Sequence, residues 1–197
     1  MQFEKLKRFM TTIGPLSNHD WQLISCELSI QQFDKHVKLL TQTGVCNSIM
    51  FLNSGIARSY VIDESGRDYT CSFNFNNDES TIKNLFLTDY ASVIKGEQST
   101  LLFESLTELE VVLIPVNYIK KLYEINHNWN RIGRLIAEEA YYITQQRTLS
   151  LLTKTATERY QELSNTLSSL MPQIPDVYLA SYLGITPQSL SRIKKNC

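Results

Sequence analysis

The chain has 197 residues, of which 43% are hydrophobic and 20% are charged, a composition typical of proteins that fold around a buried core. Its formal net charge is −1, which excludes bulk attraction to nucleic acid or to an anionic membrane, so any such attraction must be local. We expect a cytoplasmic protein, because no apolar run reaches the roughly 20 residues that span a bilayer and the amino terminus lacks the apolar core of a signal peptide.

Short segments with partial period-two alternation dominate the first 115 residues and predict strands. The turn signal Asp63-Glu64-Ser65-Gly66 lies between two of them, so residues 56–75 are interpreted as a hairpin. Short strands at regular spacing favour a barrel or a sandwich. The predicted strands are 31–40, 47–55, 56–63, 68–75 and two more within 101–115.

After Pro115 the apolar spacing becomes helical, first over 117–126 and then in a stretch that runs to about Leu152. The second stretch predicts a helix of about 24 residues. A long helix with a narrow apolar seam usually packs along a neighbour, so we expect a dimer helix, with a helix lying across its own barrel as the alternative. The expected seam residues are Trp129, Ile132, Ile136 and Ile143.

Three shorter helices are predicted in the last 43 residues. The capping box Thr155–Glu158 begins the first, which we expect to run to Met171 before Pro172 and Pro175 stop it. Asp176 is expected to cap residues 177–183, and a glycine at 184 ends that helix. Thr186 is expected to cap the last helix, which starts at Pro187 and runs to about Lys195.

Two short helices joined by a glycine-containing turn form the helix-turn-helix pattern. Arg192 can bond both acceptors of guanine, Gln188 can pair with adenine, and Ser189 can reach either base edge. Lysines at the helix end suit phosphate oxygens. A terminal helical hairpin with a solvated polar face is the alternative to DNA binding. The residues predicted to contact double-stranded DNA are Thr186, Gln188, Ser189, Ser191, Arg192, Lys194 and Lys195.

The order of elements resembles that of the cyclic-AMP receptor protein / fumarate-nitrate regulator (CRP/FNR) family of bacterial transcription regulators. The resemblance covers nearly the whole chain and is most specific over Leu179–Ile193; looser matches are Asn53–Tyr60 and Asp63–Gly66. It implies an α+β fold with an N-terminal β-roll, which is a double-stranded β-helix like that of cyclic-nucleotide-binding domains. The implied domains are a sensor β-roll with N-terminal and flanking helices at 1–127, a dimerisation helix at 128–152 and a helix-turn-helix at 153–197.

The resemblance also implies function. The expected protein is a homodimeric, DNA-binding transcription regulator that reads a palindromic site with one recognition helix per half-site. RNA polymerase and an unknown small-molecule effector are further expected partners, and a membrane is not. The alternative is a small-molecule-binding or protein-interaction module of the same fold that has lost DNA binding.

Two features depart from the family pattern. Members that bind a cyclic nucleotide hold its phosphate with an arginine, whereas here no arginine occurs between Arg67 and Arg131. The expected effector pocket is Asp89, Ser99 and Thr100, with an unknown effector and no cofactor. A β-hairpin wing is not expected either, because Pro172–Pro175 is too short to hold it.

An enzyme is not expected. A metal-dependent β-roll enzyme needs clustered histidines with a carboxylate, but His19, His36 and His127 are scattered along the sequence. The cysteines show no CxxC spacing and no nearby histidine that would complete a zinc site. We therefore expect neither a catalytic residue nor a metal ligand.

Overall fold

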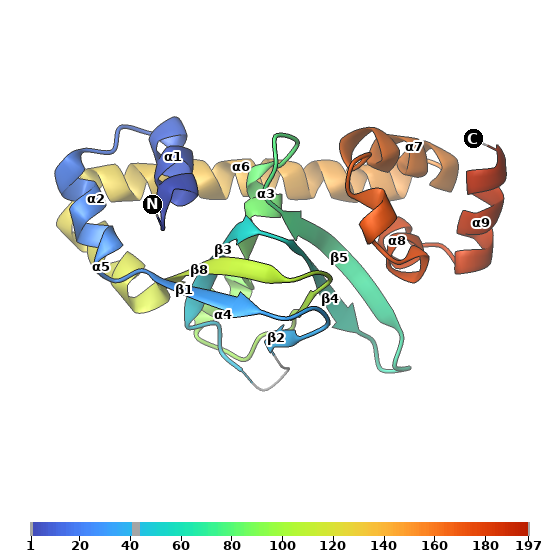
Figure 1. Ribbon diagram of the computed structural model, residues 1–197, viewed down its shortest axis with the longest axis horizontal. Coiled ribbons are helices and arrows are strands. Elements are labelled where there is room, and N and C mark those ends of the chain that lie inside the picture. Colours follow the sequence, from blue (N-terminus) through green and yellow to red (C-terminus); the bar gives the residue numbers. More distant parts are fainter. Residues whose placement is uncertain (1, 41–43, 197) are drawn as a thin grey trace.

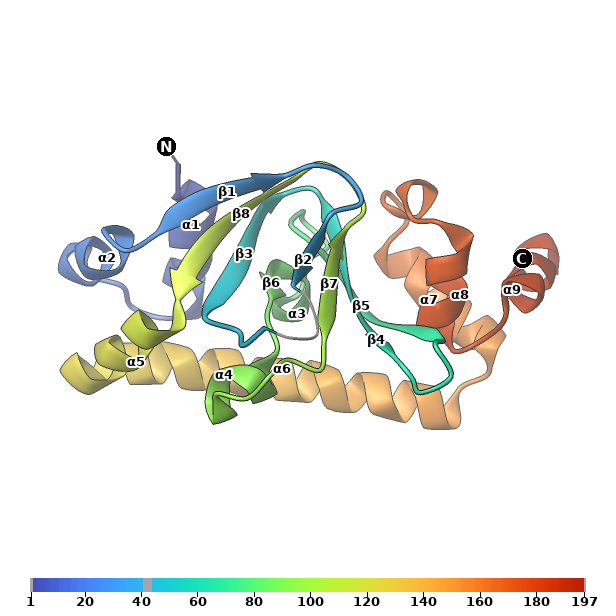
Figure 2. The same cartoon turned by 90° about the horizontal axis from the view of Figure 1, so that it is seen from below.

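The computed structural model describes residues 2–40 and 44–196. A barrel of two four-stranded antiparallel sheets forms its centre, and one long helix runs along the barrel (Figures 1 and 2). One sheet has the order β1-β8-β3-β6 and the other has the order β2-β7-β4-β5. The strands are β1 Ser29–Phe33, β2 Lys38–Leu40, β3 Ser48–Ser54, β4 Ile56–Ile62, β5 Asp68–Phe75, β6 Phe86–Leu87, β7 Leu102–Ser105 and β8 Leu109–Pro115.

The strand predictions are confirmed, with one correction. The expected hairpin forms, since β4 pairs with β5 from Ile56 opposite Phe75 to Ile62 opposite Asp68. The segment 31–40 is divided instead of continuous: β1 and β2 belong to different sheets, and His36 between them has a φ of 64°. The chain therefore turns from one sheet to the other at the point where alternation alone suggested one strand.

Gly55, between β3 and β4, is required by close packing. Its φ is 91°, and a Cβ there would lie 2.2 Å from the carbonyl oxygen of Glu108. Only glycine fits such a backbone approach. Glycine at this position therefore lets the chain pass directly from β3 in one sheet to β4 in the other.

Helices occupy both ends of the barrel and one side of it (Figure 1). The N-terminal pair lies at one end and the terminal helix pair α8–α9 lies at the other. The helices are α1 Glu4–Ile13, α2 Asn18–Ser25, α3 Ile82–Leu85, α4 Tyr90–Lys95, α5 Val116–Ile125, α6 His127–Thr153, α7 Ala156–Thr166, the 3-10 turn η1 Met171–Gln173, α8 Asp176–Leu183 and α9 Pro187–Asn196.

The long helix is confirmed in length, but part of its expected dimer seam is wrong. α6 has 27 residues and lies across its own barrel. Trp129 and Ile132 are only 3% and 2% exposed, in a core shared with α1, α2, α5 and the β1-β8-β3-β6 sheet. Ile136 packs against the same core, whereas Ile143 is partly exposed. Trp129 and Ile132 are therefore unavailable to a second chain.

Two boundaries near the carboxyl terminus also differ from those expected. α7 ends at Thr166 instead of Met171, because the chain turns there to bury Leu167 and Ile174 against α8 and the barrel. Asp176 is the first residue of α8 and does not cap it through its side chain. The capping box is confirmed, since Thr155 accepts from the Glu158 N–H and Glu158 accepts from the Thr155 N–H.

Two further cores complete the packing. The barrel interior is filled from both sheets by residues such as Leu52, Leu87 and Phe103. The third core joins strands β4 and β5 to helices α7, α8 and α9. In the described part of the chain, no helix combines the length and the apolar character that crossing a bilayer would require.

Candidate functional site

The α8–α9 pair is held by a tight turn and a small apolar core. Gly184 has a φ of 69°, and its N–H reaches the carbonyls of Ala180 and Ser181. This is the left-handed helix end that glycine favours. Leu179, Ala180, Leu183 and Leu190 are fully buried, so the helix-turn-helix geometry expected from the sequence is present.

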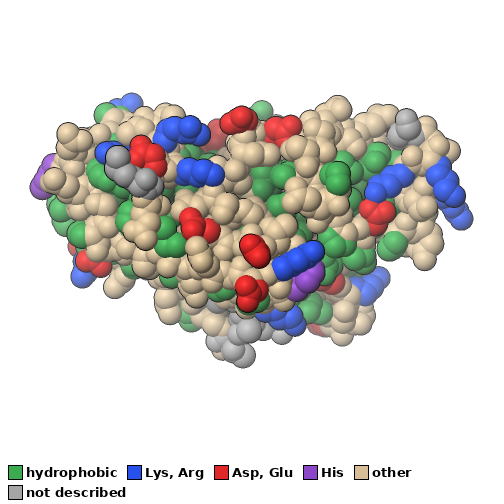
Figure 3. Space-filling view, in the orientation of Figure 1, with side chains coloured by type: hydrophobic (Ala, Val, Ile, Leu, Met, Phe, Trp, Pro, Cys, Tyr) green, Lys and Arg blue, Asp and Glu red, His purple; other side chains and the backbone are tan. Residues whose placement is uncertain are grey.

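The outer face of α9 is polar and cationic. Gln188, Ser191, Arg192 and Lys195 are exposed, and their side chains form no hydrogen bond or ion pair with another described residue. Figure 3 shows Lys and Arg side chains at the end of the molecule where α9 lies. A local cationic surface therefore exists on a chain of almost zero net charge.

The other predicted contact residues on this helix are already engaged. Thr186 caps α9, accepting from the Ser189 N–H at 3.2 Å, and its hydroxyl lies 3.0 Å from that of Ser189. Lys194 forms an ion pair with Asp176 on α8. DNA contact by any of the seven residues stays a prediction.

Sequence reasoning missed the surface through which α8 packs on the barrel. Ser181 Oγ accepts from the Thr70 N–H at 2.8 Å and donates to the Asp68 carbonyl at 2.9 Å. The Tyr182 ring lies 5.2 Å from that of Phe73, between centroids. No spacing in the sequence signals these contacts, because each side chain alone is ordinary.

Arg58 is the charged centre of that surface. It is 3% exposed and makes a bidentate pair with Asp68, at 2.7 and 2.6 Å, and a second pair with Glu104, at 2.8 and 2.9 Å. Its guanidinium also lies between the rings of Tyr60 and Tyr178, 4.1 and 3.6 Å from their centroids. Burial lowers the pKa of Arg58, but the two carboxylates raise it more, so the side chain stays a cation.

Arg147 on α6 contacts the terminal helices as well. One of its N–H groups donates to the Tyr182 carbonyl, and its guanidinium lies 3.8 Å from the Tyr182 ring centroid. Burial lowers the pKa of Arg147. The position of α6 is thus tied directly to the position of α8.

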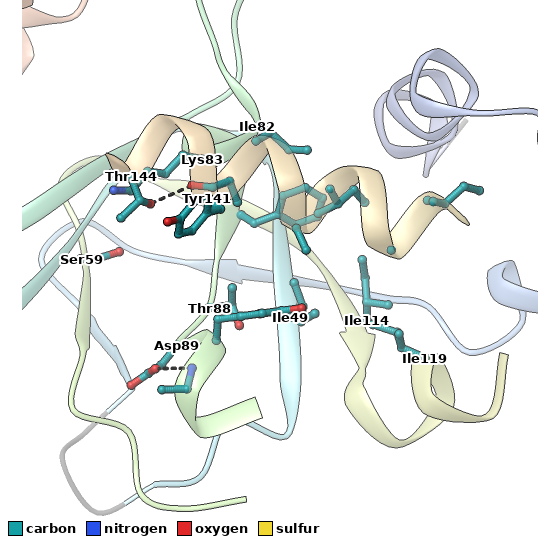
Figure 4. Close-up of a pocket in the computed structure, with 18 of the residues that line it drawn as sticks. Ile49, Ser59, Ile82, Lys83, Thr88, Asp89, Ile114, Ile119, Tyr141 and Thr144 are labelled. Atoms are coloured by element: carbon teal, nitrogen blue, oxygen red, sulfur yellow. Dashed lines mark hydrogen bonds between the residues drawn. The ribbon is translucent and has the colours of Figure 1, made fainter. Parts of the chain in front are cut away.

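A cavity of about 580 Å³ lies between α6 and the barrel (Figure 4), within the range of about 300–1,000 Å³ that small-molecule sites occupy. Apolar side chains supply most of its wall. No arginine of the described chain lines it. The apolar residues include Ile49, Ile82, Phe86, Ile114, Ile119, Trp129, Ile132 and Ile136.

Polar groups gather at one end of this cavity. Lys83 lies there with Thr144 and Tyr141 in Figure 4, and Ser59 lies on the same side, whereas Ile114 and Ile119 lie at the other end. The Lys83 ammonium forms no hydrogen bond or ion pair with another described residue. Burial lowers its pKa, as does the nearby Arg147.

The structure brings Asp89, Ser99 and Thr100 together, as expected, but uses them within the fold. One Asp89 oxygen caps α4 by accepting from the N–H groups of Ala91 and Ser92, at 3.0 and 3.3 Å. The other accepts from Ser99 Oγ and the Thr100 N–H, both at 2.9 Å. Burial would raise the pKa of Asp89, but these hydrogen bonds lower it below its ordinary value.

Of these three residues, only Asp89 lines the cavity, and its oxygens already have partners. Effector binding by Asp89, Ser99 and Thr100 stays a prediction. Among residues 2–40 and 44–196, no group of three or more His, Cys, Asp or Glu side chains could hold a metal ion.

Comparison with known proteins gives the fold its context. No family model matches the sequence, and no curated protein matches it either. A putative transcriptional regulator of the CRP/FNR family from Eubacterium rectale superposes with a TM-score of 0.71 at 16% identity, over 94% of this chain and 87% of that one. FixK2 from Bradyrhizobium japonicum gives 0.68 at 18% identity, over 86% and 83%.

The description of a third similar structure names a ligand. The c-di-GMP-responsive global regulator CLP of Xanthomonas campestris gives a TM-score of 0.70 at 12% identity, over 91% of each chain. These similarities show that the chain has the fold of the CRP/FNR regulators, with the β-roll, long helix and helix-turn-helix in the same order. The resemblance noted in the sequence is confirmed at the level of fold.

Proposed function

We propose that this protein is a dimeric, DNA-binding transcription regulator whose β-roll responds to a small molecule. The observation that carries the proposal is the two-sidedness of α9: Leu190 is fully buried, while Gln188, Ser191, Arg192 and Lys195 are exposed and unpaired with any described residue. A recognition helix needs this arrangement, with one face on its partner helix and the other free to enter a major groove.

Each exposed residue has a role in this proposal. Arg192 reads guanine through two hydrogen bonds, and Gln188 reads adenine in the same way. Lys195 contacts phosphate, which adds affinity without sequence information. Lys194 contributes less, because its ammonium already pairs with Asp176.

The similar structures support this proposal by their fold and their descriptions. Two of the three reported above are described as regulators, and one of these responds to c-di-GMP. That ligand belongs to CLP; the present cavity has no arginine along its described wall. The regulator function is proposed here on the fold and on α9, and the effector is treated separately below.

The dimer in this proposal uses the part of α6 that does not pack on the barrel. Tyr142, Leu149 and Leu152 recur at spacings of seven and three residues, which puts them on one helix face. They are 55%, 46% and 77% exposed. Two copies paired along this face would present two α9 helices to the inverted halves of a palindromic site.

Binding to a labelled random-sequence duplex, followed by fluorescence anisotropy across a salt series, tests the proposal. We expect log K to fall linearly with log salt, by about 0.9 for each phosphate contacted. Lys195→Ala should weaken binding and reduce that slope by about one contact, because it removes a phosphate contact. Arg192→Ala removes a base contact, so it should weaken binding to sites that carry the guanine by about 1–3 kcal/mol and leave the slope unchanged. Lys95 is an exposed lysine on α4. Lys95→Ala is the matched control and should change neither the affinity for DNA nor the salt slope.

Unchanged binding in both α9 variants would favour the alternative module that has lost DNA binding. One observation favours this alternative: only η1 and turns occur in the described chain between α7 and α8, so no β-hairpin wing adds phosphate contacts. The salt series separates the two, because an interaction module has no reason to release counterions from DNA.

A further inference from the structure

One end of the cavity between α6 and the barrel is lined by apolar side chains. Ile114, Ile119, Trp129 and Ile132 line that end and belong to the core shared with α1 and α2. Burying an apolar group here gains about 25 cal/mol per Å² removed from water. A ligand with an apolar body therefore fits better than one covered with polar groups.

The opposite end holds an ammonium group with no counterion. Lys83 lines the cavity beside Thr144. Ser59 and its strand partner Ser72 also line it, but their hydroxyls already donate to Asn74, so the Lys83 ammonium is the donor left for an anion at this end. A partly buried charge is costly unless it is paired. An anionic group placed here would gain a charge-assisted hydrogen bond, which is stronger than one between neutral groups.

Two residues that line the cavity also carry a buried polar atom without a partner. Trp129 Nε1 and Thr88 Oγ1 have no hydrogen-bond partner among the described residues, and Trp129 is only 3% exposed. Buried polar groups nearly always find a partner. Because both atoms are fully buried, neither is open to a molecule in the cavity, and ligand binding depends on the Lys83 ammonium instead.

We propose that this cavity binds a medium-sized monocarboxylic amphiphile, whose carboxylate pairs with Lys83 and whose apolar body lies along α6 toward Trp129. A cyclic nucleotide fits less well, because the described wall offers one ammonium for a phosphate and mostly apolar side chains for the ribose and base. The role of this ligand as an effector rests on the proposed regulator function; its binding does not.

The charged end of the ligand would lie close to the contact that holds the terminal helices. Thr144 and Arg147 are three residues apart on α6, so they lie on neighbouring turns of one face. Arg147 in turn contacts Tyr182 on α8. A carboxylate at Lys83 would change the charge environment of Arg147, and this supplies a physical route from the cavity to α8.

Titration of the full chain with sodium dodecanoate below its micelle concentration, in the absence of DNA, tests the proposal. Trp21→Phe leaves Trp129 as the only tryptophan, so its fluorescence reports on the cavity. We expect a saturable change in emission. Lys83→Met in this background should weaken dodecanoate binding at least about tenfold, and Ala140→Phe, which fills the cavity from α6, should abolish it.

Three controls decide the outcome. Lys121→Met, an exposed lysine on α5, should bind dodecanoate as the parent does, and dodecanol should bind the parent at least about tenfold more weakly. Thermal melting should show Lys83→Met at least as stable as the parent, since it removes an unpaired ammonium. Equal binding by Lys83→Met, equal binding of dodecanol, or saturable binding of cyclic AMP but not dodecanoate would overturn the proposal.

The anisotropy experiment on DNA tests the regulator function independently of dodecanoate binding. If dodecanoate binds and α9 does not bind DNA, the cavity assignment stands and the regulator function fails. If α9 binds DNA and dodecanoate does not bind, the regulator function stands and the cavity assignment fails.

Discussion

Arg58 connects three strands of the barrel to the terminal helix pair, through carboxylates on β5 and β7 and through the ring of Tyr178. We expect Arg58→Met to lower the free energy of unfolding by about 2–4 kcal/mol, because it leaves two carboxylates close together without their cation. The lower part of this range reflects Asp68, whose side chain is 35% exposed and is partly screened by water. Urea unfolding measures the loss.

Arg67→Met is the matched control for that variant. Arg67 lies in the same hairpin and pairs with Asp63, but its side chain is 71% exposed. Exposed ion pairs contribute little, so the loss should stay within about 0.5 kcal/mol. Equal losses in the two variants would show that the Arg58 network does not hold the fold together.

Asp89 makes stability depend on pH in a defined direction. Its folded-state pKa lies below the ordinary value because of the hydrogen bonds it accepts. The ionised form therefore stabilises the fold above a pH of about 4, and this contribution is lost as the pH falls through the folded-state pKa. The side chain thus acts as a structural anion and closes the loop that follows α4.

Asp89→Asn should cost about 1–3 kcal/mol at pH 7, and the difference from the parent should narrow as the pH falls below about 4. Urea unfolding at a series of pH values measures both. Asp78→Asn, on an exposed turn, controls for the loss of one negative charge. A difference between parent and Asp89→Asn that grows on acidification would contradict the assignment.

At the scale of elements, the turn between α8 and α9 sets the direction of the exposed helix. Gly184 has a φ of 69°, and a Cβ there would meet no atom within 4 Å. Gly184→Ala should therefore cost about 1 kcal/mol through backbone strain alone. Thermal or urea unfolding measures this.

Gly14→Ala provides the comparison for Gly184→Ala. Gly14 has an extended backbone, and its added Cβ would lie at an ordinary 3.4 Å from Ile132. The change in stability should stay within about 0.5 kcal/mol. If Gly184→Ala proved as neutral, the left-handed turn would not be the conformation that connects the two helices.

Elements with strong local signals could be predicted from the sequence. The hairpin of β4 and β5 has alternation and a turn signal, and α9 has a cap at Thr186 followed by Pro187. The bounds of α3 and α4 could not be predicted, because helices of four and six residues depend on tertiary packing for their stability. The early end of α7 depends in the same way on the burial of Leu167.

The candidate site could be predicted in part for a similar reason. Local patterns place Gln188 and Arg192 on the outer face of α9, and the structure agrees that both are exposed. The cavity could not be predicted, since Lys83 and Thr144 are 61 positions apart in the chain and meet only when α6 packs on the barrel. The periodicity of α6 likewise does not say which apolar face its own barrel covers.

At the scale of the whole molecule, the proposed dimer depends on the free part of α6. Leu149→Glu should convert a particle of twice the 22.7 kDa chain mass into one of single mass at tens of micromolar, because it buries a charge in an apolar seam. Size-exclusion chromatography with light scattering measures the mass.

Leu151→Glu is the matched control for this dimer test. The two leucines are 46% and 44% exposed, but residues two apart lie on nearly opposite faces of a helix. Leu151→Glu should keep the double mass. A parent of single mass, or an equal effect of both variants, would count against the seam.

The arrangement of the molecule gives one reason why an occupied cavity could alter DNA binding. α6 forms a wall of the cavity near Lys83 and contacts α8 through Arg147. α8 also rests on the barrel, where Tyr178 contacts Arg58 of β4 and Ser181 accepts from the Thr70 N–H of β5. Movement of α6 relative to the barrel therefore changes two contacts of the same helix. The orientation of the paired α9 helices would follow from that change.

Selection of bound duplexes from a random-sequence library, with the parent and with Arg192→Ala in parallel, tests the central claim most directly. The account predicts an inverted repeat with half-site centres about 10–10.5 base pairs apart, and a loss of preference at one base position of each half in the variant. Recovery of no common sequence, or of a single half-site that Arg192→Ala reads unchanged, would contradict it.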